Sequence, residues 1–134
     1  MKFTIEGEPV AQGRPRFSTI NGHARVYDPA KSRNYKKLVR SVAERHVSEP
    51  LDKPLSLTIR VYKSIPKAFS QKKRSEAIEG RIRPITKPDI DNYIKGILDG
   101  LNGVVWVDDN RIVSLTVHKF YSDKPRVEVE VEGG

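Results

Sequence analysis

The segment Lys87–Gly103 combines carboxylates and a lysine at a spacing that suits metal-dependent hydrolysis. It reads KPDIDNYIKGILDGLNG and carries Asp89, Asp91 and Lys95. Its apolar residues recur at helical spacing, which predicts a helix over residues 89–101 packed on a core. Pro88 keeps the preceding residue extended, so Asp89 stands at the entry to the helix and Asp91 in its first turn. Across such a junction two residues that are two apart can point the same way.

The same residues also have a purely structural interpretation. Asp89 is a good helix N-cap, and Asp91 in the first turn is favoured by the helix dipole, each effect being worth roughly 0.5–1 kcal/mol. Lys95 is spaced to form i,i+4 ion pairs with Asp91 and with Asp99, as on any solvated helix. Taken alone, this segment leaves both interpretations open.

A second acidic pair, Asp108 and Asp109 in WVDDNR, favours the chemical interpretation, although Asp-Asp-Asn also suits a plain turn. We expect the chain to reverse along the helix and to bring this pair back to Asp89. Carboxylates within ~4 Å repel by several kcal/mol per pair, so such a cluster requires a cation or a proton. An all-oxygen site suits Mg²⁺ or Mn²⁺. Zinc is not favoured, because the three histidines are scattered and there is no cysteine.

The charge of the chain indicates a polyanionic partner, nucleic acid above all. The net charge is +8 over 134 residues. Residues 1–88 hold 20 basic and 8 acidic side chains, whereas residues 89–134 hold 5 basic and 9 acidic ones. An acidic segment beside a basic one suits an enzyme that acts on a polyanion, because carboxylates hold the metal that a phosphate then shares. The candidate phosphate contacts are Arg14, Arg16, Arg25, Lys72, Lys73, Arg74, Arg81, Arg83 and Lys87.

The remaining pattern predicts one α+β domain over residues 1–134, with a mixed sheet and two principal helices. We expect strands at residues 2–6, 23–27, 55–62, 112–120 and 126–131, helices at about 32–47 and 89–101, and a short helical piece near 70–78. Residues 7–17 read as a basic loop followed by an Asn-Gly turn. Trp106 is assigned to the core. No apolar run is long enough to span a bilayer and none resembles a secretory signal, so with no cysteine we expect a cytoplasmic protein.

These motifs resemble the RusA family of Holliday junction resolvases, which are endodeoxyribonucleases often carried by phages. The matching stretches are DIDNYIK, LDGL and WVDDNRI, with further support from Lys119 in the following strand. GEPVAQGRPRF and YDP near the N-terminus are similar to the Gram-positive and phage branch of the family. The similarity covers nearly the whole chain in order and length.

The resemblance implies three metal-binding aspartates, Asp89, Asp91 and Asp109, with Asp108 as a neighbour, and a catalytic lysine, Lys95. It also implies a RusA-like α+β fold, a homodimer, and Mg²⁺-dependent paired nicking of four-way DNA during recombination and repair, with Mn²⁺ as a substitute and no small-molecule cofactor. Two alternatives remain at this stage. One is a junction-binding protein without catalysis, in which the aspartates only cap and turn the chain. The other is a metal nuclease that acts on flaps, forks or RNA.

Overall fold

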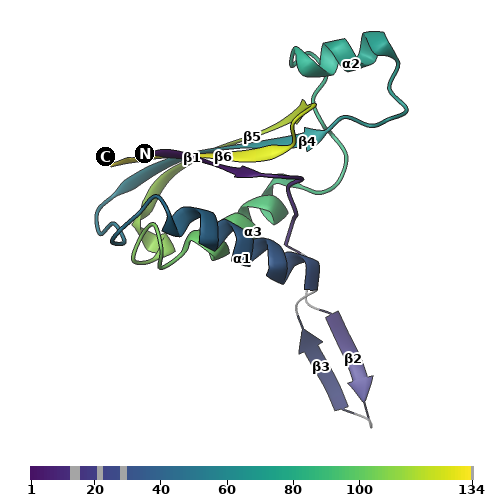
Figure 1. Cartoon of the computed structure of the whole chain (residues 1–134). Helices are drawn as coiled ribbons and strands as arrows, with labels where there is room; N and C mark the ends of the chain where they lie inside the picture. Colours follow the sequence, from purple (N-terminus) through teal and green to yellow (C-terminus); the bar gives the residue numbers. More distant parts are fainter. Residues whose placement is uncertain (13–15, 21–22, 28–29, 134) are drawn as a thin grey trace.

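The computed structural model describes residues 1–12, 16–20, 23–27 and 30–133, with side chains described for 1–12 and 30–133. The element order is β1 (Lys2–Glu6), β2 (Arg16–Ile20), β3 (His23–Tyr27), α1 (Ala30–Glu44), β4 (Leu55–Ser64), α2 (Gln71–Ile78), α3 (Ile90–Leu101), the 3-10 turn η1 (Asp109–Arg111), β5 (Ile112–Ser122) and β6 (Arg126–Gly133) (Figure 1).

Four strands form one mixed sheet in the order β1-β6-β4-β5. β6 pairs antiparallel with both β1 and β4, and β4 pairs in parallel with β5. β2 and β3 form a separate antiparallel hairpin. The α+β class with a mixed sheet is therefore confirmed, and so is the strand over residues 23–27, whereas the predicted Asn-Gly turn lies outside the described residues. The predicted basic loop ends earlier than expected, because β2 begins at Arg16.

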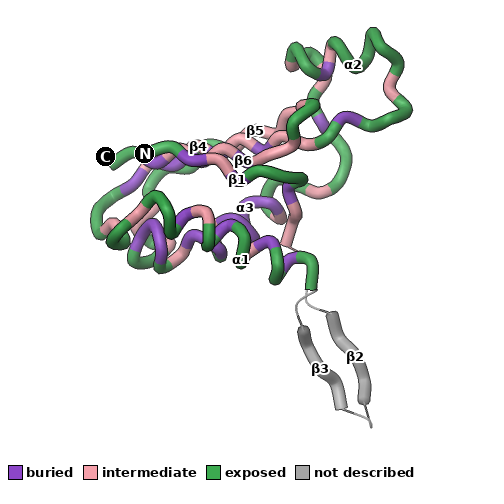
Figure 2. Tube along the Cα trace, viewed as in Figure 1, coloured by how far each residue is buried: buried purple, intermediate pink, exposed green. Residues whose placement is uncertain are grey.

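Helices α1 and α3 cover one face of the sheet, and the core lies between them and the strands (Figure 2). Alternate residues of β4 and β6 are buried there because their side chains share one face of the pleat. The two helices approach closely at Gly100, where an added Cβ would lie 2.8 Å from Val39 Cγ1. The largest fully buried side chain is Trp106, as the sequence predicted.

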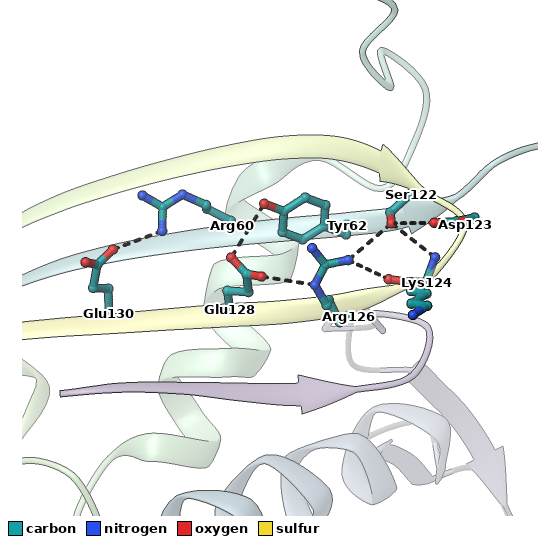
Figure 3. A network of polar contacts seen from close by, with 8 residues as sticks. All are labelled: Arg60, Tyr62, Ser122, Asp123, Lys124, Arg126, Glu128 and Glu130. Atoms are coloured by element: carbon teal, nitrogen blue, oxygen red, sulfur yellow. Dashed lines mark hydrogen bonds and ion pairs between the residues drawn. The ribbon is translucent and has the colours of Figure 1, made fainter. Parts of the chain in front are cut away.

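The opposite face of the sheet carries polar side chains rather than a helix layer. Arg60 donates to Glu130 at 2.9 Å, and Arg126 donates to Glu128 at 3.0 Å while its guanidinium stacks on Tyr62 (Figure 3). An antiparallel sheet commonly has one buried and one solvated face, and these pairs occupy the solvated one. Among the described residues, no helix is both long enough and apolar enough to cross a bilayer.

Candidate metal and nucleic-acid site

Asp89 and Asp91 lie at the start of α3 with their carboxylates unused. Asp89 occupies the cap position with extended backbone angles (φ −73°, ψ 155°), yet its side chain makes no capping hydrogen bond. Only its backbone carbonyl is engaged, by the N–H groups of Asn92 and Tyr93. Both carboxylates are exposed, and no described side chain pairs with either. The capping interpretation of Asp89 is therefore not supported, and two acidic groups remain available at a helix end that favours negative charge.

Lys95 follows Asp91 by four residues and is exposed on the same face of α3. Neither of its two possible helical ion pairs forms among the described residues. Asp99 instead pairs with Lys36 of α1 at 3.3 Å, which ties the two helices together. Within the described part of the chain no ion pair engages the Lys95 ammonium, which lies one helical turn from Asp91.

Asp109 begins the η1 turn and is oriented by the core. The indole N–H of Trp106 donates to Asp109 Oδ1 at 2.7 Å, so one carboxylate oxygen is fixed and the other is left open. Asp108 has a structural role here, because its side chain caps the turn by accepting from the Asn110 N–H at 3.0 Å. Burial raises the pKa of Asp109, as do the charges of Asp108 and Asp99, against the lowering effect of the Trp106 hydrogen bond.

The structure does not bring Asp109 to Asp89 within one chain, so that expectation is wrong. No group of three or more acidic or histidine side chains able to hold a metal occurs in the described part of the chain. The return segment pairs with Leu51 at Val105 and Val107 and then enters β5 at the far end of α3. Ile112, three residues after Asp109, opens β5, whereas the residue of β5 that contacts the Asp89 end of α3 is Lys119. Lys119 lies seven residues after Ile112, which corresponds to roughly 23 Å along the strand at ~3.3 Å per residue.

Two lysines that were not among the predicted site residues contact the segment before Asp89. Lys63 Nζ donates to the Lys87 carbonyl at 2.8 Å, and Lys119 Nζ donates to the carbonyls of Thr86 and Pro88 at 2.9 and 2.8 Å. The signal in the sequence is a charged residue that continues the apolar alternation of a strand. Lys63 follows Val61 in this way, and Lys119 follows Val117.

The predicted DNA-contacting residues from Lys72 onward lie on the segment that connects β4 to α3, residues 65–89, which we call the basic segment. Figure 1 shows that α2, which is part of this segment, lies away from the sheet. All the residues predicted there are exposed, namely Lys72, Lys73, Arg74, Arg81, Arg83 and Lys87, and Lys67 is a further exposed basic residue of the same segment. Arg83 is held in place, because its Nε donates to the Lys119 carbonyl at 2.6 Å and its guanidinium lies 4.0 Å from the Phe120 ring centroid. Arg14 lies outside the described residues, as do the side chains of Arg16 and Arg25.

Comparison with known proteins identifies the family to which these features belong. The family model described as "Endodeoxyribonuclease RusA" matches residues 6–132. "Uncharacterized protein YqaN" of Bacillus subtilis (strain 168) is 49% identical over 134 residues, which cover 98% of this chain and 94% of that protein. "Crossover junction endodeoxyribonuclease rusA" of Lactococcus phage r1t is 28% identical over 138 residues, which cover 98% of each chain.

Proposed function

The chain belongs to the RusA family of endodeoxyribonucleases, and from that premise we propose that it resolves four-way DNA junctions by paired, divalent-metal-dependent nicking. The observation that carries the proposal is the pair of exposed carboxylates at the start of α3, which have no side-chain partner among the described residues, together with the exposed Lys95 four residues after Asp91. The basic segment, which precedes α3 in the chain, supplies phosphate contacts that do not depend on DNA sequence.

In this proposal a second copy of the chain completes the predicted set of three aspartates. One chain offers Asp89 and Asp91 together, and two carboxylates leave a divalent cation short of protein ligands unless it retains several waters. The third predicted ligand, Asp109, has an open oxygen at the other end of β5. A two-fold dimer brings opposite ends of one element together, because each end of a self-paired antiparallel strand meets the other end of its copy.

The surface that suits such a dimer is the outer edge of β5. β5 is the last strand of the main sheet and pairs only with β4 among the described strands. Its apolar residues Val113 and Leu115 are 68% and 41% exposed, which is unusual for an edge that remains in water. At the far end of β5 the edge is occupied, since Arg83 binds the Lys119 carbonyl. The free stretch therefore runs over residues 112–118.

Antiparallel pairing of this stretch with its own copy, centred on Leu115, completes the site. Residue 112 of one chain then lies opposite residue 118 of the other. Asp109 of the partner subunit continues past that point toward Lys119, whose ammonium contacts the Pro88 carbonyl next to Asp89. The donor set becomes Asp89 and Asp91 from one chain and Asp109 of the partner subunit. Its all-carboxylate chemistry fits Mg²⁺ or Mn²⁺. Two such sites related by a two-fold axis suit paired cuts on opposing strands.

Asp89, Asp91 and Asp109 of the partner subunit would hold the divalent cation, which when bound would supply Lewis acidity at the scissile phosphate and a nucleophilic water near neutral pH. In the reaction a water oxygen bonds to phosphorus and gives up a proton to solvent, while the bond from phosphorus to the 3′ oxygen breaks and that oxygen takes up a proton, which leaves 5′-phosphate and 3′-hydroxyl ends. Lys95 lies four residues after Asp91 on α3, about 6 Å along the axis, where its ammonium stabilises the extra negative charge of the transition state. Trp106 fixes one oxygen of Asp109 and leaves the other for the cation.

The test compares a labelled four-way junction with a matched linear duplex, a flap and a fork, each with Mg²⁺ and with chelator. We expect symmetric nicks confined to the junction and to the metal-containing reactions. Asp91→Asn abolishes cleavage and leaves junction binding equal or tighter, because it removes a negative charge near the phosphate. Glu132→Gln, a carboxylate change at an exposed position of β6, is the matched control and keeps wild-type cleavage.

Binding without metal and without any cleavage would instead identify a junction-binding protein. Faster cleavage of the flap or the fork would identify a nuclease with a different substrate.

A further inference from the structure

Three consecutive carbonyl groups before Asp89 are held by two lysine side chains. Lys119 Nζ lies 2.9 Å from the Thr86 oxygen and 2.8 Å from the Pro88 oxygen, and Lys63 Nζ lies 2.8 Å from the Lys87 oxygen between them. Hydrogen bonds from a charged donor are stronger than neutral ones. The chain is therefore held at both residues adjoining Lys87, up to the peptide that enters Asp89.

Lys119 stands where the pattern of β5 calls for an apolar residue. It pairs in register with Val61 of β4, whose side chain is buried, and the two positions share the face of the sheet that the helices cover. A methionine of similar length would fill this space without placing a charge there. A cation at this position is disfavoured both by partial burial and by the nearby charge of Lys63. Its two carbonyl partners offset that cost, and Asp89 provides a neighbouring negative charge.

The contacts of Lys119 hold the backbone next to Asp89, one of the proposed metal ligands. Asp89 keeps extended backbone angles and does not turn its side chain back to cap α3. The carbonyl that Lys119 holds most closely belongs to Pro88, the residue bonded directly to Asp89. Arg83 binds the backbone carbonyl of Lys119 at 2.6 Å, so the lysine itself is fixed against the same segment.

We propose that Lys119 is a positioning residue that fixes the direction of the Asp89 carboxylate for divalent-cation binding, acting through the carbonyls of Thr86 and Pro88. The cation in this statement rests on the proposed function, whereas the positioning of residues 86–89 does not. Partners that orient metal ligands typically change metal affinity by 10–100-fold when they are removed.

The test uses Lys119→Met, which removes both hydrogen bonds and the charge at similar length, and Lys119→Arg, which keeps a charged donor. Arg60→Met is the matched control, because it breaks an ion pair on the opposite face of the sheet. We expect Lys119→Met to bind Mn²⁺ at least tenfold more weakly by calorimetry, with cleavage recovering toward wild type at saturating metal. Lys119→Arg restores most of the affinity, and Arg60→Met binds Mn²⁺ like wild type.

A second readout needs neither metal nor DNA. In the metal-free protein, hydrogen exchange at the amides of Asn92 and Tyr93, which donate to the Asp89 carbonyl, becomes faster in Lys119→Met than in Arg60→Met. If Lys119→Met does not fold, Lys119→Gln, which retains one donor group, takes its place in both measurements.

The outcomes separate the two proposals. A wild-type protein that binds no Mn²⁺ and cuts no DNA would overturn the proposed function, while the exchange data would still decide whether Lys119 positions residues 86–89. A wild-type protein that binds Mn²⁺, with a Lys119→Met variant that binds it equally well and exchanges equally slowly, would overturn the role of Lys119 alone. An equal loss of affinity in Arg60→Met would also overturn it, because the effect would then be one of general stability.

Discussion

Val113→Lys on the outer edge of β5 should separate the proposed dimer while leaving each chain folded. Burying a valine or leucine side chain fully is worth about 1.5–3 kcal/mol. Val113 is 68% exposed in the single chain, so burying this exposed part at an interface contributes roughly 1–2 kcal/mol per copy. A two-fold axis applies the change twice, which makes the loss about 2–4 kcal/mol, or about 30- to 700-fold in dimer dissociation constant. The added ammonium groups repel each other and act in the same direction.

The assay is sedimentation over a range of protein concentrations, with junction cleavage measured at the same concentrations. Wild-type protein should cut at concentrations where Val113→Lys is a monomer, and the variant should regain cleavage as its concentration rises. At protein concentrations low enough that both proteins are monomeric, the melting temperature of the variant should stay close to wild type, because the Val113 side chain is in water in the single chain. Leu38→Lys is the control, since Leu38 is 42% exposed on α1, the helix that contacts β1 at the other edge of the sheet. A monomeric Val113→Lys that cuts junctions as fast as wild type would refute the reasoning.

Two further predictions concern stability. The pKa of Asp109 is raised in the folded chain, so the folded state holds this proton more tightly than the unfolded chain does, and ionisation of Asp109 above the unfolded pKa costs stability. In chelator, Asp109→Asn should therefore melt at a higher temperature than wild type at pH 7. The difference in melting temperature should vanish as the pH falls below about 4, the ordinary pKa of aspartate. A variant less stable than wild type at pH 7 would contradict this. Gly100→Ala places a methyl group 2.8 Å from Val39 Cγ1 and 3.0 Å from the Lys36 carbonyl, and should cost about 1–3 kcal/mol in urea unfolding, whereas an unchanged midpoint would show that α1 moves away freely.

Most of the fold could be predicted because the pattern of apolar residues within each element indicates which of its faces is buried. The alternation in β4 and β6 and the helical stripe of α3 each record which face meets the core. The strand ends were placed too early, at residue 62 for β4 and at 120 for β5. Both strands continue to Ser64 and Ser122 because their backbones stay paired after the apolar alternation stops. Pairing of this kind depends on the neighbouring strand and leaves no local signal.

The site was predictable in its residue types but not in its assembly. The break at Pro88 placed Asp89 and Asp91 correctly at the start of α3. The position of Asp109 was not predictable, because it depends on β5 pairing in parallel with β4 from Leu55 onward, a contact between residues more than fifty apart. Because of that pairing, β5 begins far from Asp89 at Ile112, next to Asp109, and approaches the Asp89 end of α3 only at Lys119. The hydrogen bond from Trp106 to Asp109 was missed for a related reason, since a buried tryptophan was assigned only to packing.

Mixing two inactive variants tests most directly whether the carboxylates of one site come from two chains. Asp91→Asn and Asp109→Asn are each expected to be inactive alone, and subunits exchanged at equal amounts form mixed dimers in about half of all pairs. Each mixed dimer contains one site with all three aspartates, so about a quarter of the wild-type sites should return, and each junction should receive single rather than paired nicks. Mixtures as inactive as the separate variants, in samples where mixed dimers are demonstrated, would contradict the account.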